Sequence, residues 1–211
     1  MKINQIIDLT SVKANTTESD IIKLCEDAKK HQVKSVCVNG SNVEIAKKAL
    51  AGSDISITTT AGFPLGASEV FVKVCELQLA IEKGADEIDY VLSIAAVKEG
   101  DWKYIVEELS LARFASGNKI LKVIIETAYL TDQEIVKCVE LCDENEIDYV
   151  KTSTGFTEGA TVEQIKLIKK HIKGNLKIKA SGGITDKKTA LALIEAGADR
   201  IGASSVEILN D

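Results

Sequence analysis

Short apolar runs alternate with longer segments of helical periodicity along almost the whole chain. The runs are rich in Val and Ile and nearly continuous, which is typical of parallel strands buried on both faces. The predicted strands are Gln5–Leu9, Ser35–Asn39, Ser56–Ala61, Glu87–Leu92, Lys119–Ile125, Tyr149–Thr152, Lys177–Ala180 and Arg200–Ala203. The predicted helices cover residues 17–31, 41–51, 67–83, 101–116, 131–145, 161–172 and 186–196.

Local signals mark the ends of several predicted helices. Thr131–Glu134 and Thr161–Gln164 have the pattern of capping boxes, and Gly84 and Gly197 stand where a helix ends before the next strand. Eight strands with seven intervening helices favour an α/β fold, a closed (β/α)8 TIM barrel, with an open doubly wound sheet as the alternative. No linker or low-complexity segment divides the chain, so we expect one domain over residues 1–211.

The composition narrows the classes of partner. Hydrophobic residues make up 45% of the chain, the net charge is −6, and no long basic cluster occurs, which argues against nucleic acid as a partner. No apolar run has membrane length and no secretory signal precedes the first strand, so we expect no membrane partner. The five cysteines form no CxxC pair, which favours free thiols in a reducing cytoplasm. Cysteines and histidines form no metal-ligand pattern, so we expect neither a metal nor another cofactor.

Three charged residues occupy strand positions whose neighbours are apolar, namely Asp89, Lys151 and Lys179. Side chains alternate between the faces of a strand, so these three share one face and their apolar neighbours share the other. If the apolar face packs on helices, the charged side chains point into the barrel, near the strand ends where barrel enzymes carry active sites. The alternative is that both lysines are solvated and Asp89 is a cap.

Lys151 and Lys179 lie on consecutive predicted strands, and neighbouring strands are about 4.8 Å apart. A second cation beside an amine disfavours its protonation, and the neutral amine is the form that attacks a carbonyl to make an imine. The lysine pair therefore predicts Schiff-base chemistry.

Glycine and serine follow the last two predicted strands, in the segments Ser181–Ile184 and Ile201–Ser205. Barrels often bind phosphate through these two loops, using backbone N–H groups and a helix N-terminus. Gly155, after the sixth strand, could add a further amide. The alternative is that these are ordinary turns between strands and helices.

At these residues the chain resembles the deoxyribose-phosphate aldolase family. The resemblance runs in order through nearly the whole chain, and its most specific segment is Val150–Phe156. The other matching segments are Ile7–Thr10, Cys37–Val38, Gly62–Gly66, Asp86–Asp89, Lys98–Trp102, Val123–Thr127, Lys179–Ile184 and Arg200–Ser205.

The resemblance implies a metal-independent class I aldolase. It implies that Lys151 is the nucleophile and that Asp89 and Lys179 handle protons. It also implies a cytoplasmic homodimer that acts on a phosphorylated sugar and short aldehydes in deoxynucleoside breakdown. The implied substrate and phosphate contacts are Gly155, Gly182, Gly183, Gly202, Ser204 and Ser205, to which we add Cys37 and Thr152. For Cys37, filling of the core is the alternative.

The expected reaction is the reversible cleavage of 2-deoxy-D-ribose 5-phosphate to glyceraldehyde 3-phosphate and acetaldehyde. Another Schiff-base sugar-phosphate aldolase or a transaldolase would share Lys151 and differ in the donor. An isomerase or epimerase of the same fold would form no imine. A sugar-phosphate-binding barrel without catalysis is the non-enzyme alternative, and the Lys–Lys–Asp set argues against it.

Overall fold

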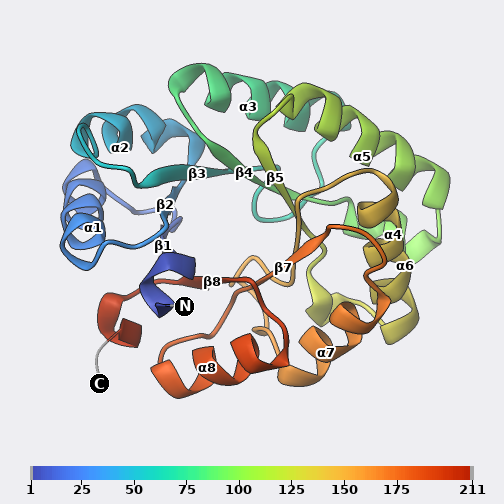
Figure 1. Ribbon diagram of the computed structural model, residues 1–211. Coiled ribbons are helices and arrows are strands. Elements are labelled where there is room, and N and C mark those ends of the chain that lie inside the picture. Colours follow the sequence, from blue (N-terminus) through green and yellow to red (C-terminus); the bar gives the residue numbers. More distant parts are fainter. Residues whose placement is uncertain (1, 210–211) are drawn as a thin grey trace.

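The computed structural model describes residues 2–209. Eight parallel strands close into a barrel in the order of the sequence, and β1 pairs with β8 to complete it (Figure 1). The strands are β1 (Ile7–Ser11), β2 (Ser35–Val38), β3 (Ser56–Ala61), β4 (Glu87–Val91), β5 (Ile120–Ile124), β6 (Tyr149–Lys151), β7 (Lys177–Ala180) and β8 (Arg200–Ala203). The predicted barrel is confirmed, and each strand lies within two residues of its predicted bounds.

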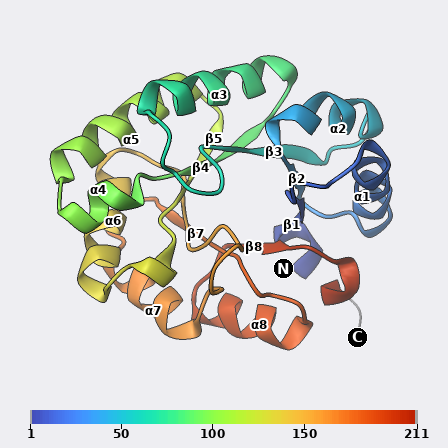
Figure 2. The ribbon, with the colours of Figure 1, turned by 180° about the vertical axis from the view of Figure 1, so that it is seen from behind.

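The helices surround the barrel, as the view from behind also shows (Figure 2). They are α1 (Glu18–His31), α2 (Val43–Ala49), α3 (Val70–Lys83), α4 (Ile94–Glu99), α5 (Trp102–Ser116), α6 (Asp132–Glu144), α7 (Val162–His171) and α8 (Lys187–Ala196). Short 3-10 helices cover η1 (Ile3–Ile6), η2 (Gly40–Asn42), η3 (Thr127–Tyr129) and η4 (Val206–Leu209). Seven of the α-helices match the predicted ones, and α4 is additional.

Two differences from the predicted elements have local causes. The first strand begins at Ile7 because η1 precedes it, and the Asn4 carbonyl of that turn accepts from the Lys34 N–H instead of continuing the sheet. Helix α4 has only six residues, too few for a clear periodic signal. It is separated from α5 by Gly100, whose positive φ of 70° ends one helix before Asp101 caps the next.

The predicted helix ends follow from local hydrogen bonds. Both predicted capping boxes are present, at Thr131 and Thr161, and Thr17 forms a third. Gly84 ends α3 with a φ of 112°, in the left-handed region that favours glycine.

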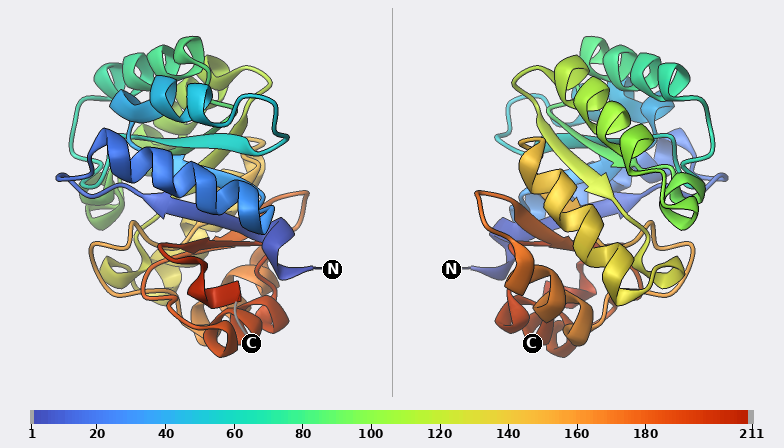
Figure 3. Two further views of the ribbon diagram at one scale, coloured as in Figure 1. Left: turned by 90° about the vertical axis from the view of Figure 1, so that its left-hand side faces the viewer. Right: turned by 90° about the vertical axis from the view of Figure 1, so that its right-hand side faces the viewer.

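The apolar core lies between the barrel and the helices. Ile88, Val150 and Ile178 are fully buried there, each beside a charged residue that faces the interior. Figure 3 shows the N-terminus at the end of the barrel opposite the loop between β1 and α1. The strands therefore present their carboxyl ends and the loops that follow them at one mouth. Among the described residues, no helix is long and apolar enough to cross a membrane.

Candidate active site

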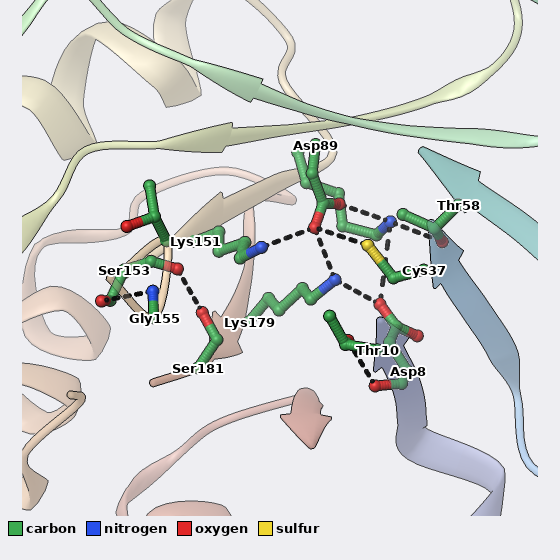
Figure 4. A network of polar contacts seen from close by, with 12 residues as sticks. Asp8, Thr10, Cys37, Thr58, Asp89, Lys151, Ser153, Gly155, Lys179 and Ser181 are labelled. Carbon is green, nitrogen blue, oxygen red and sulfur yellow. Dashed lines mark hydrogen bonds and ion pairs between the residues drawn. The ribbon is translucent and has the colours of Figure 1, made fainter. Parts of the chain in front are cut away.

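Strands β4, β6 and β7 bring Asp89, Lys151 and Lys179 together inside the barrel. The Asp89 Oδ2 atom accepts hydrogen bonds from Lys151 Nζ and Lys179 Nζ, each at 2.7 Å (Figure 4). Lys151 and Lys179 are register partners on adjacent strands, so their side chains leave the sheet on the same side. Strand alternation thus predicted that all three side chains face the interior, and the bridging of the two amines by one Asp89 oxygen is what the structure adds.

Four more charged side chains continue this cluster, and all are buried. Asp8 Oδ2 lies 2.5 Å from Lys179 Nζ, while Asp8 Oδ1 accepts from Arg200 at 2.7 Å. On the other side, Lys122 Nζ lies 3.0 Å from Asp89 Oδ1 and 2.7 Å from Glu87 Oε2. Glu87 Oε2 in turn lies 3.3 Å from Arg200. We call the closed sequence of contacts Arg200–Asp8–Lys179–Asp89–Lys122–Glu87 the charge ring.

Opposite charges keep the carboxylates of the ring ionised. Burial alone would raise the pKa of Asp8, but Lys179, Lys122 and Arg200 outweigh it and hold the pKa below its usual range. For Asp89, burial also opposes ionisation, yet Lys122, Lys151 and Lys179 hold its pKa well below the usual value. Two carboxylates at the centre of the barrel are therefore negative at neutral pH.

The basic groups of the ring are likewise held in their charged form. Burial would lower the pKa of Lys179, but Asp8 and Asp89 raise it. Burial would also lower the pKa of Lys122, but Asp89, Asp8 and Glu87 raise it. The pKa of Arg200 is raised by Asp8 and Glu87, again against the effect of burial. Lys179 is thus a fixed cation beside Lys151.

A cavity of about 570 Å³ opens at the mouth of the barrel above this cluster. Lys151 lines it, whereas Asp89 and Lys179 lie beneath and are fully buried. All six predicted phosphate contacts line the same cavity, namely Gly155, Gly182, Gly183, Gly202, Ser204 and Ser205. The structure therefore brings the predicted nucleophile and the predicted phosphate loops to one site.

Thr152 and Cys37 are not among the described residues that line the cavity, and both are fully buried. The Thr152 hydroxyl accepts from the Ser181 N–H at 3.2 Å, which ties the end of β6 to the loop after β7. The Cys37 thiol lies 3.9 Å from Asp89 Oδ2, and burial together with the Asp89 charge raises its pKa to about 11. Cys37 is thus a neutral thiol against the Asp89 carboxylate.

Close contact between the backbones of neighbouring loops explains why glycines form the rim of the cavity. Gly182 has a φ of 87°, and a Cβ added at Gly159 would lie 2.1 Å from the Gly182 carbonyl oxygen. Nearby, Glu126 accepts the Thr154 hydroxyl at 2.5 Å and the Thr157 hydroxyl at 2.7 Å, so it braces the loop that carries Gly155. The loops after β6 and β7 are in this way held close to one another and to the strand ends.

Sequence reasoning missed four ring members, Asp8, Glu87, Lys122 and Arg200. A detectable signal was present, because Asp8 in Ile7–Leu9 and Lys122 in Leu121–Val123 are charged residues between apolar strand neighbours. The criterion that selected Asp89, Lys151 and Lys179 would have selected these two as well. Glu87 and Arg200 open their strands, where a charged residue is ordinary, so only the closed barrel distinguishes them.

A family model described as DeoC/LacD family aldolase matches residues 2–209. The chain is 48% identical to the deoxyribose-phosphate aldolase of Finegoldia magna, over 97% of this chain and 97% of that protein. It is also 48% identical to the deoxyribose-phosphate aldolase of Alkaliphilus oremlandii, over 100% of this chain and 96% of the relative.

Solved structures agree with these relatives. An aldolase named QR15 superimposes with a TM-score of 0.93 and 40% identity, covering 97% of this chain and 92% of that one. The tetrameric deoxyribose phosphate aldolase from Aeropyrum pernix superimposes with a TM-score of 0.87 and 29% identity, covering 98% and 89% respectively. Similarity in sequence and in backbone therefore extends over nearly the full length of both partners.

Proposed function

The chain belongs to the DeoC/LacD family of aldolases, and we propose that it uses Lys151 to cleave 2-deoxy-D-ribose 5-phosphate. The reaction is the reversible formation of glyceraldehyde 3-phosphate and acetaldehyde, catalysed by a metal-independent class I lyase. The observation that supports this role is the position of the Lys151 side chain at the cavity. Lys151 is the lysine of the buried cluster that reaches the cavity, and that cavity is the one that the glycine and serine loops line.

In the proposed first half of the reaction, the neutral Lys151 amine attacks the C1 aldehyde of the open-chain sugar. The carbinolamine loses water to give an iminium. The C2–C3 bond then breaks as the C3 hydroxyl loses its proton, so that C3 becomes the aldehyde of glyceraldehyde 3-phosphate and the electron pair moves onto the iminium to give an enamine. Protonation of the enamine at C2 and hydrolysis release acetaldehyde and restore the amine.

Asp89 and Lys179 are proposed to handle the protons of these steps. Asp89 remains a carboxylate and contacts the Lys151 amine directly, so it orients the nucleophile and can take up a proton through a water molecule in the cavity. Lys179 shares the same carboxylate oxygen and stays cationic. Its charge keeps Asp89 in the carboxylate form.

The phosphate is proposed to bind at the rim formed by the loops after β6, β7 and β8. Backbone N–H groups at Gly182 and Gly183 and the hydroxyls of Ser204 and Ser205 would supply neutral donors. Gly155 lines the same rim, and its N–H donates to the Ser153 hydroxyl at 3.2 Å. Lys13 and Lys23 line the same cavity on the β1 side, where the carboxylates of Asp20 and Asp27 also line it, so we assign the phosphate to the neutral donors. A phosphorylated sugar held there by its C5 end would extend its C1 end toward Lys151.

We propose that the protein forms a homodimer through an apolar strip on α3. Phe71, Cys75 and Leu79 recur at every fourth residue of this helix and are all exposed, Phe71 by 77%. Contiguous exposed apolar surface of this kind marks interaction sites, and a second copy is the partner we propose. Light scattering of wild type and a Phe71→Glu/Leu79→Lys variant would test this, since a wild-type monomer would contradict it.

The five free cysteines support a reducing compartment, and we propose the cytoplasm. The family match over residues 2–209 supports the proposal that residues 1–211 form one barrel domain.

Trapping with a carbonyl donor tests the nucleophile. Wild-type enzyme treated with acetaldehyde and borohydride should gain one ethyl group on the peptide that contains Lys151. Dihydroxyacetone in place of acetaldehyde should label poorly, which separates this reaction from that of a transaldolase. Labels spread over exposed lysines such as Lys166, without preference for Lys151, would contradict the mechanism.

A further inference from the structure

We propose that Glu87 and Arg200, which lie below the cavity, are positioning residues that set the charge of Lys151 through the charge ring. The proposal rests on the proposed function of Lys151 as the imine-forming amine. It assigns control of the nucleophile to the whole ring and not to its neighbour Lys179 alone.

The charge ring is electrically complete without Lys151. It contains three basic groups, Arg200, Lys179 and Lys122, and three carboxylates. Along the ring, each basic group lies between two carboxylates and each carboxylate lies between two basic groups. Lys122 Nζ also lies 3.8 Å from Asp8 Oδ2, across the ring. A neutral ring therefore leaves Lys151 as the additional basic group of the interior.

Lys151 shares its carboxylate with two ring members. Asp89 contacts Lys151 and Lys179 through Oδ2 and Lys122 through Oδ1. The other buried ion pair among the described residues, Lys73 with Glu108, lies between α3, α5 and the outer face of β4, where it also bonds Tyr90. A protonated Lys151 thus gives the barrel interior one net positive charge, and a neutral Lys151 gives it none.

Glu87 and Arg200 lie on opposite sides of Lys151 in the barrel. Arg200 on β8 is level with Lys151, because Lys179 pairs with both, and two strands correspond to about 10 Å across a sheet. Glu87 on β4 lies lower, since it pairs with Ile120 whereas Lys151 pairs with Ile124, and it is linked to Lys151 through Lys122 and Asp89. The groups that face the interior beside them are Asp8 on β1, Cys37 on β2, Lys122 on β5, Tyr149 on β6 and Lys179 on β7. Neither Glu87 nor Arg200 lines the cavity, so an effect on imine formation would pass through the ring and not through contact with the substrate.

Removing a negative or a positive charge from the ring should shift the pH midpoint of imine formation at Lys151 in opposite directions. Glu87→Gln leaves the ring with one extra positive charge, which disfavours a second cation and moves the midpoint of imine formation to lower pH. Arg200→Gln leaves one extra negative charge and moves the midpoint to higher pH. With an effective dielectric constant of about 20 and a separation of about 10 Å, each shift is about one pH unit.

The test measures the rate of trapping by acetaldehyde and cyanoborohydride as a function of pH, with the labelled peptide identified by mass spectrometry. Glu108→Gln is the matched control, because it also removes a buried carboxylate charge but lies outside the ring; its stability should fall and its midpoint should match wild type. Glu87→Asp and Arg200→Lys keep the charges and should stay near the wild-type midpoint.

Two opposite shifts, with both charge-retaining variants near wild type, support the proposal. Unshifted midpoints, or shifts of the same sign, overturn it. If Arg200→Gln does not fold, Glu87→Gln alone decides, since its downward shift is the direction that general damage to the site does not produce. Wild-type enzyme without label on Lys151 would overturn the proposed function instead, so the two failures are distinguishable.

Discussion

The floor and the rim of the cavity are built from different materials. The floor is Lys151 with Asp89 and Lys179 directly beneath it, three charged side chains on three barrel strands. The rim consists of glycines and serines in the loops after β6, β7 and β8, such as Gly182 and Ser204. The two regions meet where Ser181 bonds Thr152 and Ser153.

The difference follows from what each region must do. Proton transfer and imine formation require groups with controlled charge, and strands packed on both faces fix such groups and exclude water. Phosphate already carries its charge, so its site needs many donors at close range, which backbone amides at glycines provide. Changes in the floor should therefore affect the rate of chemistry, and changes in the rim should affect substrate binding.

The largest effect is expected for the nucleophile itself. Lys151→Leu removes the only proposed imine-forming group, so kcat/KM should fall by roughly 10⁴-fold or more. Steady-state assays on deoxyribose 5-phosphate, with a thermal melt to confirm folding, would measure this. Lys166→Leu, at an exposed position of α7, is the control and should retain activity. Retained activity in Lys151→Leu would contradict the proposed role of Lys151 as the nucleophile.

A smaller but still large effect is expected for Lys179→Leu. It leaves Asp8 and Asp89 with excess negative charge, so more of Lys151 stays protonated at neutral pH, and activity should fall by roughly 10²–10⁴-fold. Because raising the pH removes that proton, trapping should recover partly in alkali, while the loss of a proton-transfer partner should persist.

The measurement for Lys179→Leu is the rate of borohydride trapping against pH. Lys73→Leu is a suitable control because Lys73 is equally buried but pairs with Glu108 outside the barrel interior. Superimposable profiles for wild type and Lys179→Leu would mean that Lys179 serves only as an acid–base group or substrate anchor.

Substitutions in the rim should change the KM for the phosphorylated substrate. In a Ser204→Ala/Ser205→Ala variant two donors to the phosphate are lost, each worth about 1.5–3 kcal/mol, so KM for deoxyribose 5-phosphate should rise by roughly 10²-fold or more. Weak activity on free deoxyribose should change little, because that substrate has no phosphate. Equal losses on both substrates would instead show that the serines support the fold, for example through the Ser205 hydroxyl that accepts from the Glu207 N–H.

The smallest effect is expected from removal of metals. The iminium on Lys151 accepts the electron pair that a Lewis acid would otherwise stabilise, so extended dialysis against EDTA should leave the rate unchanged. A loss of activity that zinc or manganese restores would contradict the proposed Schiff-base mechanism at Lys151.

Local sequence patterns were sufficient for the elements and their order. Short apolar runs, most of them nearly continuous, identified the eight strands, because most positions of a strand buried on both faces are apolar. Capping boxes at Thr131 and Thr161 fixed helix starts within one residue, since those hydrogen bonds join residues three apart. Helix α4 was missed because six residues carry too little periodicity.

Alternation along single strands was also sufficient to direct Asp89, Lys151 and Lys179 toward one interior. It did not provide the partners, because a contact such as Arg200 with Asp8 joins residues 192 positions apart in the chain. That contact exists only where β8 closes onto β1. The sequence thus determined which groups face inward, and closure of the barrel alone decided which opposite charges meet and leave Lys151 as the amine at the cavity.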